Sequence, residues 1–232
     1  MIVSIHQPQY LPWLGYFHKM NRADAFVFLD TVQFKKNEFQ NRNRIKGPQG
    51  PQWLTVPVLQ QLGQDIRDVR INTTVRWQKK HITGLASCYG RAPYYGAYKD
   101  ALEDLLDQPW ELLSSLNIEA TKLIASLIGI DTPLSLASEM ECVSDDRDRR
   151  LIEITQKLGG SSYLAGIGGR DYMNMATWEE AGIEVLFQAF EHPVYPQVFN
   201  GFSSHLSAVD LLFNAGEEAM EYLDGSHSGN ET

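Results

Sequence analysis

The feature that most constrains the fold is a change of hydrophobic periodicity along the chain. Short apolar runs at 2–5, 25–30 and 162–165 have the length of buried strands, and segments with helical spacing of apolar residues separate them. Between 75 and 130 the spacing stays helical. Strands that alternate with helices are typical of a parallel sheet covered by helices. We therefore predict an α/β fold with a mostly parallel sheet flanked by helices and a helical segment around 75–130.

Local signals set the expected ends of several elements. Helices are expected over 77–89, 98–106 and 110–128, with Pro109 in the first turn of the third and Gly129 at its end. Further strands are expected at 54–58, 66–71, 133–137 and 183–190, and further helices after Pro12, from Asp145, around Trp178 and over 206–213. The chain has no internal repeat and no low-complexity linker. We predict one domain over 1–225 and a flexible tail over 226–232.

Composition excludes several classes of protein. The chain has 232 residues, of which 43% are hydrophobic and 11% aromatic, enough for a packed core rather than disorder. It has no run of about 20 apolar residues, so no membrane span is expected. A basic segment followed by a small-residue cleavage site is absent at the start, which favours the cytoplasm. Cys88 and Cys142 are too few for a disulfide scaffold or a cysteine zinc site.

The net charge of −9 argues against general nucleic-acid binding, but the charge is unevenly distributed. Residues 1–91 contain 13 Lys and Arg against 5 Asp and Glu, whereas 92–232 contain 7 against 24. A basic first part of an acidic protein can attract a small anionic ligand such as a phosphate, a sugar nucleotide or a carboxylate. Two solvated faces of opposite sign would give the same counts.

A cluster of distinctive residues, HQPQYLPWLGY at 6–16, follows the first predicted strand. In α/β sheets ligands bind beyond the carboxyl ends of the strands. His6 is therefore the first candidate for a catalytic acid or base, and Gln7, Tyr10 and Trp13 are candidates for substrate binding. Alternatively, His6 bonds to a neighbouring loop, and the prolines and aromatic rings only stiffen the turn.

A second cluster follows the second predicted strand. Asp30 is a candidate base or a group that orients His6. Amides and cations suited to phosphate or carboxylate oxygens come next, namely Gln33, Lys35, Lys36, Gln40, Asn41, Arg42 and Lys46, and Trp53 could stack on a ring of the ligand. We expect His6, Asp30, Gln33 and Arg42 in one cleft. The alternative is an exposed polar hairpin without a ligand.

The glycines of GIGGRDY at 166–172 could cradle an anion with their backbone, which makes Gly168 and Gly169 candidate binding residues. They could equally form a tight turn. A dinucleotide fingerprint would need glycine at position 171, which is Asp171. The six histidines form no metal-binding pair such as HExxH, so no metal site is predicted, and the sequence leaves any cofactor open.

Taken together, these clusters resemble the WbqC-like protein family. The matching stretches lie at 6–16, 30–34, 40–42, 53–58, 163–166, 168–169 and 206–214. The resemblance implies a role in the synthesis of surface polysaccharides such as O-antigen, and an activity like that of a glycine transferase that acylates an amino sugar. It assigns no catalytic residues, so His6 and Asp30 rest on the reasoning above.

Three functions fit these features. The first is a transferase that joins an acyl or aminoacyl group, glycyl among them, to a nucleotide-linked amino sugar, with His6 as base. The second is a nucleotidylyl-transfer enzyme, because some α/β folds grip a triphosphate with a histidine after the first strand. The third is a noncatalytic partner of glycan-assembly enzymes. The acyl donor, the acceptor sugar, any use of ATP or coenzyme A and the oligomeric state stay open.

Overall fold

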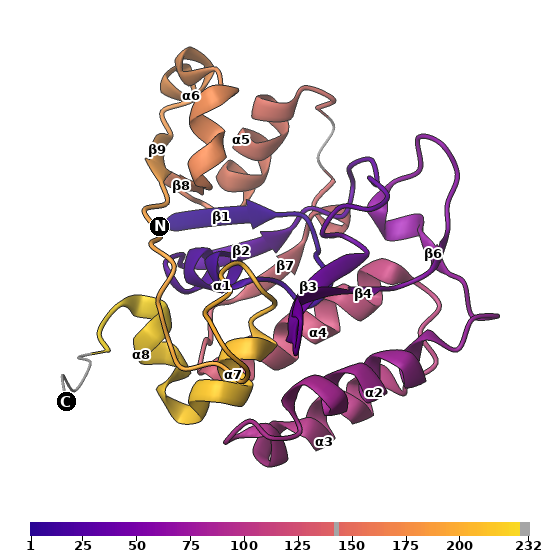
Figure 1. The fold of residues 1–232 in the computed structure, drawn as a ribbon. Helices are drawn as coiled ribbons and strands as arrows, with labels where there is room; N and C mark the ends of the chain where they lie inside the picture. The colour runs from indigo at the N-terminus through magenta and orange to yellow at the C-terminus, as the bar shows by residue number, and fades with distance from the viewer. Residues whose placement is uncertain (142–143, 228–232) are drawn as a thin grey trace.

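The computed structural model describes residues 1–141 and 144–227 and has a five-stranded parallel sheet at its centre (Figure 1). In spatial order the strands are β7 (Leu134–Leu136), β2 (Ala25–Phe28), β1 (Ile2–His6), β8 (Ser162–Ala165) and β9 (Glu184–Phe187). Helices cover both faces of this sheet. The predicted α/β fold with a mostly parallel sheet is confirmed.

The strand order makes the space beside β1 a natural place for a ligand. The chain passes from β1 to β2 and β7 on one side, then returns to β8 and β9 on the other. In register, Ser4 of β1 faces Leu164 of β8. Connections leave these two neighbours in opposite directions, and the carboxyl ends of such a strand pair flank the crevice in which α/β proteins bind ligands.

The predicted helical segment is also confirmed. It consists of α2 (Trp77–Tyr89), α3 (Tyr95–Leu106) and α4 (Leu113–Ile128). Gly129 ends α4 in the left-handed conformation, as predicted, but α4 begins at Leu113 rather than near Pro109. The reason is tertiary, because Leu112 is extended and pairs with Arg70 in an isolated bridge.

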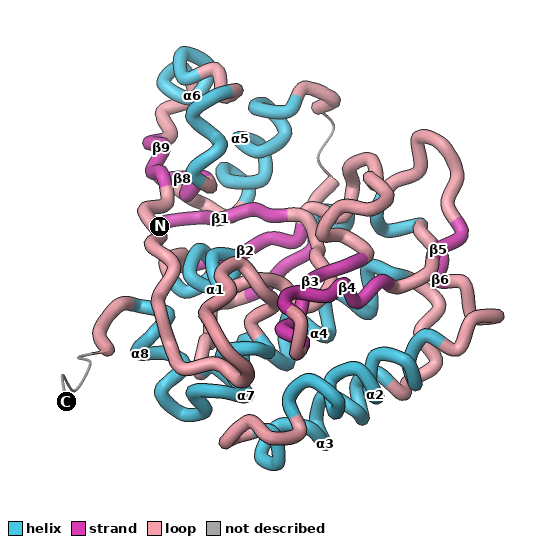
Figure 2. The backbone as a smooth tube through the Cα atoms, viewed as in Figure 1, coloured by secondary structure: helices cyan, strands magenta, loops and turns pink. Residues whose placement is uncertain are grey.

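The remaining helices lie between and after the strands of the main sheet, and the last two follow one another at the end of the chain. They are α1 (Leu14–Asn21), α5 (Arg147–Lys157), α6 (Met175–Glu180), α7 (Val209–Ala215) and α8 (Ala219–Asp224), with 3-10 turns at Ala137–Glu139, Ile167–Asp171 and Gly216–Glu218. Asp146 caps α5 by accepting from the Arg149 N–H. Helix α7 starts later than predicted, because Ser207 pairs with Trp13 in a bridge. Residues 188–206 form a long loop between β9 and α7 (Figure 2).

Two small antiparallel pairs lie outside the main sheet. The first joins β3 (Arg42–Gly47) to β4 (Gly50–Thr55), and the second joins β5 (Val58–Leu59) to β6 (Arg70–Ile71). The strand predicted over 66–71 is largely wrong, since Ile66–Asp68 is a 3-10 turn. Ile66 and Val69 are both fully buried. Apolar residues three positions apart lie on the same side of a 3-10 turn, and here the turn leads into a two-residue strand.

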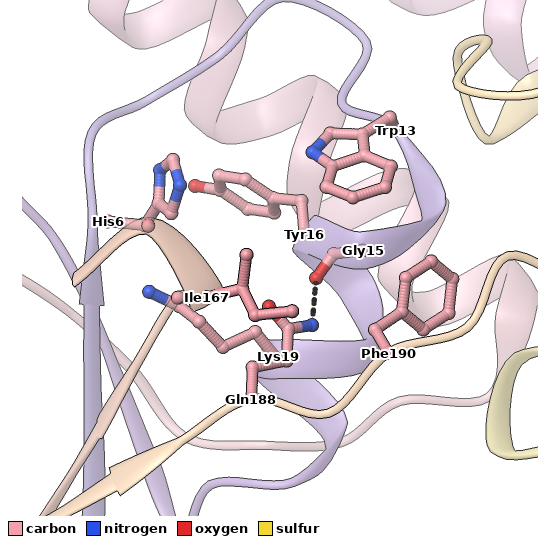
Figure 3. A pocket seen from close by; sticks show the side chains of 10 residues that line it. His6, Trp13, Gly15, Tyr16, Lys19, Ile167, Gln188 and Phe190 are labelled. Carbon is pink, nitrogen blue, oxygen red and sulfur yellow. Dashed lines mark hydrogen bonds between the residues drawn. The ribbon is translucent and has the colours of Figure 1, made fainter. Parts of the chain in front are cut away.

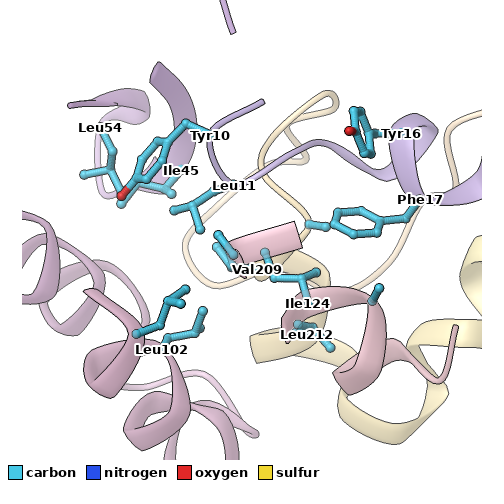
Figure 4. Close-up of a cluster of buried hydrophobic side chains, with 14 of the residues drawn as sticks. Tyr10, Leu11, Tyr16, Phe17, Ile45, Leu54, Leu102, Ile124, Val209 and Leu212 are labelled. Atoms are coloured by element: carbon cyan, nitrogen blue, oxygen red, sulfur yellow. The ribbon is translucent and has the colours of Figure 1, made fainter. Parts of the chain in front are cut away.

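The two faces of the sheet pack into separate apolar clusters. Val3, Ile5 and Val27 pack with residues of α5 and α6, including the fully buried Trp178. The opposite face joins a larger cluster with the remaining helices and the β3–β4 hairpin, shown in Figure 4 for Leu11, Phe17, Ile45, Ile124, Val209 and others. Alternate residues of each strand therefore serve different layers, as expected of a sheet covered on both faces.

Two predictions concern the end of the chain and the membrane. In the predicted tail, the ring of His227 stacks on that of Tyr222, with 3.9 Å between centroids, and 228–232 lie outside the described residues, as does Cys142. Within the described ranges, no helix is both long and apolar enough to cross a bilayer. The single domain over 1–225 stays a prediction.

Candidate functional site

Two adjoining cavities lie at the carboxyl ends of β1 and β8. The large cavity has a volume of about 810 Å³ and extends towards α5, and the small pocket has about 210 Å³ and extends towards Trp13 and Phe190. Figure 3 shows the small pocket. Four residues line both, namely His6, Lys19, Gly166 and Gly168. We call this shared zone the junction.

His6, the last residue of β1, lies at the junction with a defined tautomer. Its Nδ1 lies 3.1 Å from the backbone oxygen of Gln7. A carbonyl only accepts, so Nδ1 carries the proton and Nε2 keeps a free lone pair. Burial lowers the pKa of His6 to about 3, helped by the nearby charge of Lys19. At neutral pH His6 is therefore a neutral imidazole that can accept a proton.

Lys19 is a site residue that the sequence analysis did not predict. It lies on α1, is 3% exposed, and donates from Nζ to the Ile5 oxygen at 2.9 Å. Burial lowers the pKa of this amine to about 7. A signal was present in the sequence, because Lys19 follows Tyr16 by three positions and so shares the apolar face of the helix.

Asp30 does not pair with His6. It is 3% exposed, and its carboxylate accepts from both the N–H and the hydroxyl of Ser138, at 3.0 and 2.7 Å. Ser138 follows β7, so this carboxylate ties the end of β2 to the neighbouring connection. Of the four residues expected in one cleft, only His6 and Gln33 line the large cavity, whereas Asp30 and Arg42 line neither space.

Amide side chains fix the loop that follows β2. Gln7, which lines the large cavity, accepts from Gln40 at 2.7 Å, and Gln40 accepts from the backbone N–H of Lys35 at 2.8 Å. Asn41 is 1% exposed and bonds to Asn37 and Val56, so it acts as scaffold. Lys35 lines the large cavity; its exposed neighbour Lys36 lines neither space.

Two predicted binding residues belong to the core. Tyr10 is fully buried and its hydroxyl lies 2.8 Å from Nδ1 of His81, so it cannot stack on a ligand. Lys46 is 2% exposed and donates to Gln197 and to the Gly201 oxygen. The long loop before α7 supplies both acceptors, which no local pattern around Lys46 reveals.

The predicted aromatic residues are in different places. Trp13 lines the small pocket, where its ring stacks on His205 and meets Phe190 edge-on, with centroids 5.2 and 5.6 Å apart. Trp53 is 44% exposed, and the guanidinium of Arg42 lies 4.1 Å from its ring centroid. Trp53 lines neither the large cavity nor the small pocket.

The glycines after β8 form one wall of the large cavity. Gly168 and Gly169 both line it, and Gly169 donates to the Gly166 oxygen at 2.9 Å within a 3-10 turn. A Cβ on Gly166 or Gly168 would meet no atom within 4 Å, whereas on Gly169 it would lie 3.0 Å from the sulfur of Met173. The first two glycines therefore leave space open, and the third permits close packing.

The charge of the large cavity is one-sided. Lys19, Lys35, Arg147 and Arg150 line it, and among the described residues no Asp or Glu lines it or the small pocket. Both arginines come from α5, more than a hundred residues from His6, so the sequence analysis could not associate them with the site. The guanidinium of Arg147 lies 4.0 Å from the ring centroid of Tyr172, which also lines the cavity.

Comparison with known proteins gives a family. The model of the WbqC-like protein family matches residues 7–222. The chain belongs to the WbqC-like family. A protein of Mycobacterium tuberculosis (strain ATCC 25618 / H37Rv), "Uncharacterized protein Rv1507c", is 35% identical over 225 residues, which cover 95% of this WbqC-like chain and 96% of the relative. No solved structure matches.

The geometry gives this WbqC-like protein a definite chemical capacity. At the junction, a neutral imidazole can take a proton, and the cations around it can hold an anion. In 1–141 and 144–227, no group of three or more His, Cys, Asp or Glu residues is placed to hold a metal ion.

Proposed function

We propose that this WbqC-like protein transfers an acyl or aminoacyl group, glycyl among them, to the amine of a nucleotide-linked amino sugar in surface-polysaccharide synthesis. One observation carries the proposal. His6, whose Nδ1 carries the proton and whose Nε2 is free, lines both a large cavity with cationic side chains and a small pocket with aromatic side chains. This arrangement supports a role for His6 as a base between bound phosphates and a compact ring or acyl group.

The step requires an activated acyl donor, such as an ester or thioester. The amine nitrogen attacks the carbonyl carbon, and a C–N bond forms. His6 takes the proton that the nitrogen loses. The bond from the carbonyl carbon to the leaving group then breaks, and the proton on His6 passes to that group. Burial lowers the pKa of His6 to about 3, so the imidazole is neutral before the attack and, once protonated, releases the proton readily. A bound anionic diphosphate would raise this pKa and so favour the first proton transfer.

The lining of the small pocket suits a single ring. Trp13, Tyr16, Ile167 and Phe190 supply apolar surface, and Gln188 supplies a polar group. Gln188 is held in place because its amide nitrogen donates to the Gly15 oxygen at 2.7 Å. Pockets with a mainly apolar lining and a few fixed polar groups are typical of small-molecule sites.

Nucleotidylyl transfer is the second candidate, and the strand order favours it. The cavities lie where the connections of β1 and β8 diverge, a position at which α/β folds bind nucleotides. The two reactions differ in their products, because nucleotidylyl transfer releases pyrophosphate and acyl transfer leaves the diphosphate intact. A noncatalytic partner is disfavoured, since it would have no use for a buried lysine beside a partly buried, neutral histidine at one junction.

The test begins with a thermal-shift screen of nucleotide sugars, ATP, coenzyme A and amino acids. A ligand at a hundred times its dissociation constant stabilises the protein by about 2.7 kcal/mol. Mass spectrometry of reactions with the binding ligands should then show an amino sugar that has gained one acyl group. Release of pyrophosphate instead would support nucleotidylyl transfer, and a folded His6→Ala variant with full turnover would refute the role of His6.

A further inference from the structure

Lys19 is a buried cation that lines both the large cavity and the small pocket. Its ammonium group has three N–H donors, and one of them reaches the Ile5 oxygen at 2.9 Å. Within residues 1–141 and 144–227, this is the single hydrogen bond of the Lys19 ammonium group. The side chain is nevertheless 3% exposed, and it faces both the large cavity and the small pocket. A buried cation with free donors at a cavity wall is suited to bind an anion.

No neighbouring group neutralises this charge. Lys35, Arg147 and Arg150 add to it, and no Asp or Glu of the described residues lines either space. The other titratable side chains there are His6, Tyr16, Tyr163 and Tyr172. Burial raises the pKa of Tyr16 and of Tyr163, so both stay neutral, and His6 is neutral as well. The Arg150 guanidinium lies 3.9 Å from the exposed carboxylate of Asp145, which does not line either space. The anion that neutralises Lys19 must therefore come from the ligand.

The number and type of cations favour a diphosphate over a single carboxylate. One carboxylate can occupy one guanidinium fork or one ammonium, whereas a diphosphate presents several charged oxygens along its length. Four cationic side chains line the large cavity in a chain whose net charge is −9. Two of them are arginines, whose forks match phosphate geometry.

We propose that Lys19 binds the diphosphate group of a nucleoside-diphosphate ligand at the junction, with Lys35, Arg147 and Arg150 contacting the same anion from the large cavity. This inference extends the proposed function. It rests on that function only for the sugar that is attached to the diphosphate. A sugar attached to that diphosphate would then enter the small pocket, and its amine would come within reach of His6. The nucleoside would lie in the large cavity.

Binding of the anion must be coupled to a proton. In the free protein the pKa of Lys19 is about 7, so at pH 8 most of its amines are neutral. A bound diphosphate favours the charged form and raises this pKa. The ligand therefore brings close to one proton into the site at pH 8, and its affinity falls as the pH rises above 7.

Isothermal titration calorimetry at pH 8, in buffers of different ionisation enthalpy, tests this directly. The probes are inorganic pyrophosphate and the common nucleoside diphosphates. The expected results are binding tighter than about 1 mM, uptake of close to one proton per nucleoside diphosphate, and affinity that weakens from pH 7 to pH 9. In Lys19→Met, affinity should fall at least tenfold and the proton uptake should disappear. Lys99→Met, which removes an exposed cation on α3, is the matched control.

Three outcomes would overturn the inference: no probe binds, the nucleoside diphosphates bind without proton uptake, or Lys99→Met weakens binding as much as Lys19→Met. Should Lys19→Met fail to fold, the wild-type proton uptake and pH dependence still decide. The two proposals fail separately. Diphosphate binding with proton uptake but without acyl transfer would refute the transferase alone. Acyl transfer by a Lys19→Met protein with an unchanged KM would refute the role of Lys19 alone.

Discussion

Replacing Lys19 by methionine should stabilise the protein and remove part of its pH dependence. Methionine keeps the length of the side chain and removes the charge that the buried position disfavours. Burial lowers the pKa of Lys19 from an ordinary value of 10.5 to about 7. A tenfold difference in proton affinity between the folded and unfolded states corresponds to about 1.4 kcal/mol. At pH 7 the charge therefore lowers the free energy of unfolding by about 4 kcal/mol.

The net gain is smaller, because the variant loses a hydrogen bond. Lys19 donates to the Ile5 oxygen at 2.9 Å, and a buried carbonyl without a donor costs about 1–3 kcal/mol. We expect Lys19→Met to raise the free energy of unfolding at pH 7 by about 2 kcal/mol. The site thus gives up stability to keep a cation at the junction.

The pH dependence is the sharper observable, because the lost hydrogen bond changes the free energy of unfolding by the same amount at every pH. Between pH 7 and 10.5 the unfolded chain binds a proton on Lys19 that the folded protein has largely released. Stability from this group therefore rises with pH across that window. The wild type should gain about 2 kcal/mol from pH 7 to pH 9 relative to Lys19→Met.

Urea unfolding of both proteins at pH 7, 8 and 9, followed by tryptophan fluorescence at constant ionic strength, measures this difference. Comparing wild type with variant cancels the groups that titrate equally in both. Lys99→Met should leave the pH dependence unchanged, because its ammonium is exposed and lies 3.4 Å from Asp100. A difference between wild type and Lys19→Met that stays constant with pH would refute the reasoning, and so would one of opposite sign.

Three further predictions concern other positions. In His6→Gln the side chain can still form hydrogen bonds but cannot titrate, so turnover should fall about 100-fold. The free energy of unfolding in urea should change by less than about 1 kcal/mol. A large loss of stability would indicate a structural role for His6 instead. Asp30→Asn should lower stability by about 1–3 kcal/mol, because Asp30 accepts two bonds from Ser138, but should leave ligand affinity unchanged in calorimetry. Binding of a diphosphate should weaken between low and high salt, and an unchanged affinity would point to a neutral ligand.

The local sequence determined the architecture. Apolar runs of strand length and helical spacing predict β1, β2, β8 and the helices of 75–130, because these patterns reflect which face of each element is buried. The location of the site follows from the same reasoning, since His6 ends β1 and ligands gather at that edge. Gln7, Gln33, Lys35, Gly168 and Gly169 were predicted beside it and do line the large cavity.

Only the tertiary structure decided which polar residues face that cavity. Asp30, Tyr10 and Lys46 are in polar clusters of the sequence, yet their partners Ser138, His81 and Gln197 come from segments 71 to 151 positions away, so they hold the scaffold instead. Arg147 and Arg150 reach the site on α5 for the same reason. Lys19 is the plainest case. A sequence shows a lysine on a helix, but only the packing of that helix against β1 removes water from the ammonium and leaves its charge for a ligand to neutralise.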